Sequence, residues 1–467
     1  MKHPRLTALA AVLMAGLAAP GAAFAGSENV EIDRLRSEFE QKLKALQENY
    51  EGRLQEMEAR LSRNEGQAKA ALAAPAADVG SQQPAVQGGN AQTAFNPEIS
   101  LVLQGAFVKQ KDVADRSITG FLPATPDRGN SRGFSLGNTE LVIAANIDPY
   151  FRGHANLSVG DGTVDVEEAW FQSIGLGNGL SFKGGRFISG IGYGNEQHPH
   201  VWDFADQSLM YRVLFGEHLV QDGVQMKWLA PSETYLEFGL EAGRGQFFPG
   251  SEAGGNRSGA GTWAAFAKVG DDIDVSQSWR AGINYLATHP RAREGLIEDR
   301  TGVQAHTGFS GESKTWIADF VWKWAPEGNA MERSLKLQGE AFRRSESGDM
   351  SCSDNSAAGG ACSGLADGYR ATQSGWYAQG VYQFMPRWRV GYRYDRLDPG
   401  NISYGALPLA ASDYRPVKNS LMADYSPSEF SRFRLQLAQD KSMQGVVDNQ
   451  MTLQYIHSLG AHGAHNF

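Results

Sequence analysis

The sequence predicts an all-β transmembrane barrel of about 16 antiparallel strands, preceded by an α-helical coiled-coil segment. From Glu98 onward, apolar and polar residues alternate with a period of two, which is typical of strands with one apolar and one polar face. The connections between strand candidates alternate between short turns and long polar loops. After residue 25 no stretch approaches the ~18 consecutive apolar residues of a transmembrane helix, so the sequence excludes a helical membrane protein.

Residues 1–25 have the three-part plan of a secretory signal peptide. Lys2 and Arg5 precede an apolar run at 6–17, and small residues occupy the cleavage positions of Ala23-Phe24-Ala25. The alternative is an N-terminal membrane anchor, but the apolar run is short for crossing a bilayer. We therefore expect a mature chain that starts near Gly26 in an oxidising compartment.

Residues 26–65 predict a coiled coil, and residues 66–97, rich in Ala, Pro, Gln and Gly, predict a flexible linker. The apolar spacing 3-4-4 repeats every eleven residues, which favours nearly straight or weakly right-handed helices. An amphipathic helix on a membrane surface is the alternative, but the mixed charges of the polar face favour an oligomerising coil, which we expect to be a trimer. The apolar positions are Ile32, Leu35, Phe39, Leu43, Leu46, Tyr50, Leu54, Met57 and Leu61.

The predicted barrel occupies residues 98–467, and its clearest alternation lies near the C-terminus, where Trp388, Val390 and Tyr392 share one face of a strand. A soluble β-sandwich would also alternate, but the asymmetric connections favour a barrel. The predicted strands are 98–110, 134–147, 151–159, 164–174, 180–188, 219–229, 233–243, 262–270, 278–288, 314–324, 334–345, 375–385, 387–396, 417–425, 430–440 and 449–459. The predicted long connections include 111–133, 189–218, 244–261, 289–313, 346–374 and 397–416, whereas 160–163 is short.

Aromatic residues gather at the ends of the predicted strands, for example at Tyr150-Phe151 and at Trp322 and Trp324. Such residues form the interfacial girdles of membrane barrels, and the chain also ends on the aromatic Phe467. The sequence therefore predicts the outer membrane of a Gram-negative cell, with membrane lipid as a partner and the coil in the periplasm.

Cys352 and Cys362 lie close together in a Ser/Gly/Ala-rich stretch and predict a disulfide that pins a surface loop. A metal or redox pair is the alternative, but the CxxC spacing is absent. The net charge of −9 argues against nucleic acid as a partner.

Residues 189–218 would form the third outer loop, and a barrel of this size needs a segment that narrows its lumen. We expect this loop to constrict the lumen with Glu196, His198, His200, Asp203 and Asp206. An acidic loop that faces a basic wall would give a transverse field; the alternative is that the lumen charges only hydrate the channel. The inward-facing candidates are the basic residues Lys227, Arg280, Lys336, Arg387, Arg389, Arg393, Arg432 and Arg434 and the acidic residues Asp165, Glu167, Glu237 and Glu241.

The stretch Gly185-Arg186-Phe187, followed by Gly192 and Asn195-Glu196, and the terminal Phe467 resemble the outer-membrane porins grouped with the phosphate-selective porin O/P family. The resemblance implies a trimeric, roughly sixteen-stranded channel for passive diffusion of small hydrophilic solutes or ions. The third loop departs from the phosphate-selective pattern, because it is not rich in lysine or arginine. A coil ahead of the barrel is also similar to some sugar-specific porins, so uptake of phosphate, sugar or a transition metal is the alternative function.

The metal alternative rests on His198 and His200, with His218 further along the same loop. Histidines one residue apart on an extended segment point the same way, and imidazole binds zinc, copper or nickel. A loop in which these side chains only pack and hydrogen-bond is the other interpretation. No cofactor is expected.

The residues Gly133-Phe134-Ser135-Leu136-Gly137 match the G-x-S-x-G pattern of hydrolases. That pattern requires a turn from a strand into a helix that exposes the serine. Here it opens a predicted strand without a following helix, so we do not expect an enzyme.

Overall fold

The computed structural model describes Lys44 and residues 97–113, 116–122, 132–137, 139–160 and 163–460. The predicted signal peptide and nearly all of the predicted coil and linker lie outside the described residues, as does Phe467. No helix among the described residues is both long and apolar enough to cross a membrane. The helical segments are short: η1 (Pro199–Val201), α2 (Leu209–Leu214), α3 (Glu252–Gly255), η2 (Pro326–Gly328) and η3 (Ser356–Ala358).

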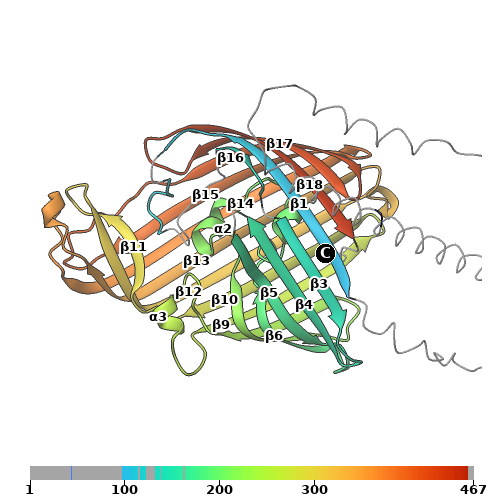
Figure 1. Ribbon diagram of the computed structural model, residues 1–467, viewed down its shortest axis with the longest axis horizontal. Helices are drawn as coiled ribbons and strands as arrows, with labels where there is room; N and C mark the ends of the chain where they lie inside the picture. The colour runs from blue at the N-terminus through green and yellow to red at the C-terminus, as the bar shows by residue number, and fades with distance from the viewer. Residues whose placement is uncertain are drawn as a thin grey trace, which may run out of the picture. The chain divides into compact units, whose positions relative to one another are not determined.

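The described strands form one antiparallel sheet that closes into a barrel of sixteen strand positions, as predicted (Figure 1). Closure comes from β1, which pairs with the last strand, β18, from Ser100↔Gly460 to Lys109↔Met451. Two short elements, β2 and β11, add no strand position of their own. The strand β2 pairs with β1 beyond the β1–β3 pairing, and β11 pairs with β12 beyond the β10–β12 pairing. The strands are β1 (Glu98–Lys109), β2 (Gly133–Ser135), β3 (Thr139–Asn146), β4 (Phe151–Gly160), β5 (Thr163–Ser173), β6 (Leu180–Ile188), β7 (Val220–Leu229), β8 (Tyr235–Gly243), β9 (Thr262–Asp274), β10 (Gln277–Thr288), β11 (Arg293–Glu298), β12 (Gln304–Trp324), β13 (Ser334–Cys352), β14 (Ala366–Met385), β15 (Trp388–Ser403), β16 (Val417–Ser428), β17 (Ser431–Lys441) and β18 (Asp448–Gly460).

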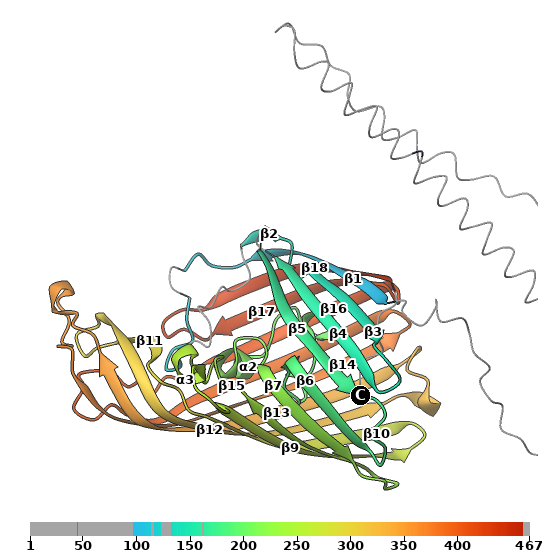
Figure 2. The ribbon, with the colours of Figure 1, turned by 60° about the horizontal axis from the view of Figure 1, so that its bottom comes forward.

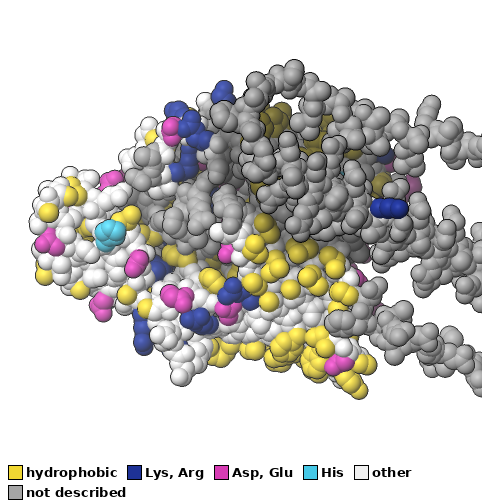
Figure 3. Space-filling model, in the orientation of Figure 1, with side chains coloured by type: hydrophobic (Ala, Val, Ile, Leu, Met, Phe, Trp, Pro, Cys, Tyr) yellow, Lys and Arg dark blue, Asp and Glu magenta, His cyan; other side chains and the backbone are white. Residues whose placement is uncertain are grey.

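Alternation along each strand separates an apolar exterior from a largely polar interior. On β12, Trp316 and Phe320 are about half exposed on the outside, whereas Ile317 and Asp319 are buried. Figure 3 shows hydrophobic side chains gathered over the part of this face that β4 to β6 occupy in Figure 1. Because a closed sheet also pairs every strand edge, the backbone polar groups of the barrel are satisfied within the sheet.

Four strands, β12 to β15, extend much further than the sequence predicts. β12 has 21 residues and β14 has 20, so parts of the predicted loops 289–313, 346–374 and 397–416 are strands, and the loop assignment was wrong there. In these outer segments both faces carry many polar residues, so the period-two contrast that marks a strand in the sequence disappears. Figure 2 shows the long strands extending toward the end of the barrel that carries β11.

The outer segments have a small core of their own. Phe309, Met350 and Tyr369 are buried there together with Leu407. The predicted disulfide between Cys352 and Cys362 is confirmed, and both cysteines belong to this cluster. We call this group of residues the outer cluster; it stabilises the strand segments that extend beyond the closed barrel.

The G-x-S-x-G stretch does not form the turn that a hydrolase requires. Gly133–Ser135 is the short strand β2, which pairs with Ala106–Val108 of β1. The side chain of Phe134 is 89% exposed, and the next described element is the strand β3. The geometry therefore differs from an exposed serine between a strand and a helix.

Candidate functional site

The segment between β6 and β7, residues 189–219, lies inside the barrel. It carries η1 and α2, and Leu209, Tyr211 and Leu214 of α2 are completely buried. These side chains pack on apolar residues of the inward wall, which include Phe266 of β9 and Phe342 of β13. We call residues 189–219 the inner loop.

The helix α2 is held at both ends by groups of suitable charge. The Ser208 side chain caps its N-terminus, and the Leu209 N–H donates to Asp395 of β15 at 3.0 Å. At the other end, Arg344 of β13 donates to the Val213 carbonyl at 3.1 Å. An anion at the N-terminus and a cation at the C-terminus both complement the helix dipole, so the wall is built to hold this helix.

Two buried glutamates hold the first part of the inner loop. Glu241 of β8 accepts hydrogen bonds from the Ser189 hydroxyl at 2.5 Å and the Gly190 N–H at 2.8 Å. Glu340 of β13 accepts from the N–H groups of Tyr193 and Gly194 at 3.0 and 2.8 Å. The hydroxyl of Tyr211 also donates to Glu340, at 2.5 Å.

The three acidic residues predicted for the loop pair with basic residues of the wall. Glu196 lies 2.6 Å from Lys268 and 3.4 Å from Arg280.

Asp203 forms ion pairs with Lys336 and, at 3.2 Å, with Arg389.

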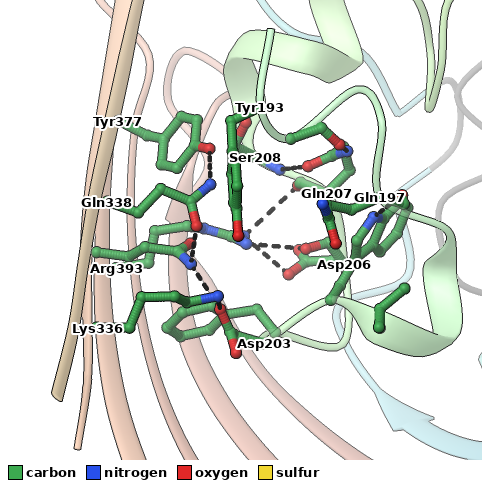
Figure 4. A pocket seen from close by; sticks show the side chains of 15 residues that line it. Tyr193, Gln197, Asp203, Asp206, Gln207, Ser208, Lys336, Gln338, Tyr377 and Arg393 are labelled. Atoms are coloured by element: carbon green, nitrogen blue, oxygen red, sulfur yellow. Dashed lines mark hydrogen bonds and ion pairs between the residues drawn. The ribbon is translucent and has the colours of Figure 1, made fainter. Parts of the chain in front are cut away.

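Asp206 pairs with Arg393 at 2.9 Å and with Lys418 at 2.5 Å. The loop is therefore tied to β9, β10, β13, β15 and β16 by charge. Figure 4 shows Asp203 and Asp206 opposite Lys336 and Arg393 around a cavity of about 30 Å³.

The ion pairs keep these loop carboxylates ionised. Burial alone would raise the pKa of Asp203, but Lys336 and Arg389 outweigh it and hold that pKa well below its usual range. Burial also opposes ionisation of Asp206, and Lys418 with Arg393 likewise keeps the pKa of this carboxyl well below its usual range. Both groups therefore stay negative, with nearby cations to balance them.

Arg432 and Arg434 are further cations of the basic wall, and they lie beside Asp424 together with Arg389, which also pairs with Asp203. Arg389 and Arg434 both pair with Asp424 of β16, and the Arg434 contact measures 2.9 Å. Arg432 is held more loosely: its guanidinium lies 3.9 Å from Asp424 and 3.4 Å from the carbonyl oxygens of His200 and Trp202. Three guanidiniums thus surround one carboxylate of the wall.

Other predicted wall residues fall in different places. Lys227 pairs with Glu237 at 3.1 Å on neighbouring strands. Arg387 lies in the turn between β14 and β15, where it has a φ of 72° and is exposed. Asp165 of β5 is also exposed.

The predicted histidines face the acidic side of the barrel. His200 Nδ1 lies 3.0 Å from Glu140 of β3. His198 lies between Glu140, Glu167 and Glu168, with its Nε2 atom 3.3 Å from Glu168. The inner loop therefore presents histidines to glutamates on one side and carboxylates to lysines and arginines on the other.

Several residues of the site were not predicted. They are Glu140, Glu168, Lys268, Glu340, Arg344, Asp395, Lys418 and Asp424. All lie on barrel strands and are at most 6% exposed. Successive side chains of a strand point alternately inward and outward, and this alternation, which we call strand parity, would have placed many of them inward if applied to every strand.

Fold and site together define a closed antiparallel barrel with a charged loop folded inside it. The chain belongs to the same family as an uncharacterised protein of Aquifex aeolicus (strain VF5), to which it is 30% identical over 399 residues, or 80% of this chain and 81% of that protein. No family model matches the chain.

Solved structures that resemble the chain include three proteins of low sequence identity. The outer membrane channel DcaP of Acinetobacter baumannii is 12% identical, with a TM-score of 0.45, and 78% of this chain and 96% of that chain are covered. OprB of Pseudomonas putida is 13% identical, with a TM-score of 0.47 and coverage of 79% and 95%. OmpT of Vibrio cholerae is 10% identical, with a TM-score of 0.48 and coverage of 78% and 99%.

Proposed function

We propose that the protein is an outer-membrane porin that lets small hydrophilic solutes or ions diffuse passively through its barrel. The apolar exterior and the polar interior support this proposal, because a closed barrel with this polarity is suited to span a bilayer around a wet lumen. Aromatic residues at strand ends, such as Trp228 and Trp388, are about two-fifths exposed and would lie at the lipid interface.

The observation that carries the proposal is the inner loop with its charged contacts on both sides. A loop fixed inside the barrel narrows the passage, and charges along a narrow passage set which ions enter. The loop carboxylates Asp203 and Asp206 are neutralised by Lys336, Arg389, Arg393 and Lys418. Arg432 and Arg434 are two further cations, and both lie beside the single carboxylate of Asp424. We therefore expect the channel to prefer small anions.

The assembly that we propose is a homotrimer in the outer membrane, with the N-terminal coil in the periplasm. Support comes from the sequence: the signal peptide of residues 1–25 and the eleven-residue repeat of residues 32–61.

Single-channel recording in a planar bilayer tests the proposal directly. We expect ohmic conductance steps in triplets and, in a salt gradient, a reversal potential that reports a preference for anions. Arg432→Gln should reduce this preference, because it removes a loosely held lumen cation.

Arg387→Gln is the matched control, since Arg387 lies in an exposed turn and its loss should leave the reversal potential unchanged. A correctly folded protein that gives no conductance would refute the channel function.

A further inference from the structure

A group of glutamate and histidine side chains joins the inner loop to strands β3 and β5. Glu140 comes from β3, Glu167 and Glu168 come from β5, and His198 comes from the loop just before η1. Histidines supply ion-pair partners to all three glutamates. Three carboxylates around one imidazole ring can share a proton with it, and the same oxygen and nitrogen atoms can bind a metal ion.

The strand β5 brings two consecutive glutamates to the same face. Its pairing with β4 shifts register between Asn156 and Leu157, so that Asn156 pairs with Glu168 while Leu157 pairs with Val166. Glu167 is the extra residue of this β-bulge. In a regular strand neighbouring side chains point to opposite faces, but a bulge re-aims one of them. Here Glu167 and Glu168 both reach His198.

The distances around His198 suit a metal ion better than direct hydrogen bonds. Its Nδ1 atom lies 3.6 Å from Glu140 Oε2 and 3.9 Å from Glu167 Oε2, which is long for a hydrogen bond. Ligand atoms about 3.4 Å apart would surround a tetrahedral ion with bonds of ~2.0–2.1 Å. One ligand atom from each of Glu140, Glu167 and His198 can be chosen so that all lie within 4.8 Å of one another. Small side-chain movements would close this set around an ion.

The remaining contacts orient these three side chains. His198 directs its other ring nitrogen toward Glu168 at 3.3 Å, an arrangement that fixes the ring of a metal-binding histidine. His200 Nδ1 lies 3.0 Å from the other oxygen of Glu140. The amide nitrogen of Asn156 donates to both Glu140 and Glu167, at 3.1 and 2.9 Å. Ligating carboxylates are commonly held by such hydrogen bonds.

Two buried polar atoms at this position lack a hydrogen-bond partner among the described residues. They are Nδ1 of His198 and Oδ1 of Asn156, and the Asn156 side chain is completely buried beside both carboxylates. A buried ring nitrogen that faces two carboxylates without a hydrogen bond to either indicates that a further group belongs between them. An ion bound by Glu140, Glu167 and His198 would supply a partner for the ring nitrogen of His198.

We infer that Glu140, Glu167 and His198 bind a divalent transition-metal ion such as Zn²⁺ between the inner loop and strands β3 and β5. A mixed set of imidazole and carboxylate selects such an ion over Mg²⁺ or Ca²⁺, which prefer oxygen ligands. Three protein ligands leave a fourth position for water or another donor. The binding site goes beyond the proposed diffusion function and does not depend on the barrel conducting ions.

The test is calorimetric titration of Zn²⁺ into the full-length protein, folded in detergent and freed of metal with EDTA. We expect one strong site per chain. His198→Gln and Glu167→Gln should each weaken binding at least tenfold, roughly the loss that follows disruption of the groups around a bound metal. The binding should persist in excess Mg²⁺.

His289→Gln is the matched control. His289 lies 3.7 Å from Glu312, but this pair is exposed, and no second carboxylate of the described residues converges on it to form a metal site. The variant should therefore bind Zn²⁺ as the unmodified protein does. All variants keep the C-terminal histidines, which removes any contribution of those residues from the comparison. Heat-modifiable migration on gels confirms that each variant has folded.

The inference is overturned if Zn²⁺ binds the unmodified protein no more tightly than the His198→Gln variant, or if Mg²⁺ displaces it. If His198→Gln does not fold, Glu167→Gln decides the matter, because Glu167 lies at the bulge and is only partly buried. Co²⁺ gives a second readout: its visible absorption should report nitrogen ligation in the unmodified protein and lose intensity in His198→Gln.

Discussion

The carboxylate of Asp206 lies 2.9 Å from the guanidinium of Arg393, and this contact joins the middle of the inner loop to strand β15. The Asp206 side chain is 15% exposed and that of Arg393 is 3% exposed. Lys418, equally buried, pairs with the other oxygen of the same carboxylate. One aspartate is therefore shared by two buried cations. Each cation also has a second carboxylate, Asp395 for Arg393 at 2.9 Å and Asp440 for Lys418 at 3.5 Å.

Asp206→Asn should destabilise the folded protein by about 1–3 kcal/mol, because the buried Arg393 and Lys418 each lose one charged partner and keep only Asp395 and Asp440. Urea unfolding followed by tryptophan fluorescence measures this change. The control is Asp398→Asn, whose partner Arg415 is 58% exposed, and which should cost no more than about 1 kcal/mol. Equal effects of the two substitutions would contradict the anchoring role of Asp206.

The cost of Asp206→Asn should be the same at pH 7 and pH 5. The folded-state pKa of Asp206 is depressed below the ordinary value of 3.8, so its contribution is complete above that value and is lost as the pH falls toward the folded pKa. Parallel unfolding curves of the two proteins at several pH values measure the difference. A cost that disappears between pH 7 and pH 5 would show that Asp206 is not stabilised in this way.

The close packing of the inner loop predicts a penalty for a methyl group at Gly192. This residue has a φ of +74°, and an added Cβ would lie 2.1 Å from the Tyr211 hydroxyl oxygen. Gly302 is the matched control, because it has a φ of +81° but no atom within 4 Å of the added Cβ. Gly302→Ala should cost about 1–2 kcal/mol from backbone conformation alone.

Gly192→Ala should cost clearly more, since the clash adds to the same conformational strain. The comparison uses the urea midpoints of the two variants in detergent. Similar midpoints would mean that the inner loop can move away from Tyr211 without loss.

Strand parity predicts the walls of this barrel well and its irregular positions poorly. Arg280 and Arg393 were expected to face inward because they alternate along their strands with outward-facing aromatic residues, and both are buried in ion pairs. Glu168 was missed because the bulge at Glu167 reverses the parity of β5, and bulges leave little trace in a single sequence. The sequence also identifies Asp203 as a loop residue but gives no information on Lys336 as its partner, since the pair depends on the path of the loop.

The outer cluster predicts a local effect of the disulfide. Cys352 and Cys362 are ten residues apart, and closing a loop of this size stabilises the closed state by about 3 kcal/mol. Cys352→Ala with Cys362→Ala, or reduction with dithiothreitol, should therefore loosen the outer cluster and leave the barrel wall intact. Hydrogen exchange should show lost protection at 353–365 and unchanged protection in β17, because different parts of a protein open with different free energies.

Channel conductance should also stay unchanged on reduction, since neither cysteine contacts the inner loop in the ion pairs and hydrogen bonds of the described residues. A fall in β17 protection, or a conductance that changes with dithiothreitol, would show that the outer cluster and the inner loop are coupled. Unchanged exchange at 353–365 would instead show that the packing of Phe309, Met350 and Tyr369 holds the outer strands without the covalent bond.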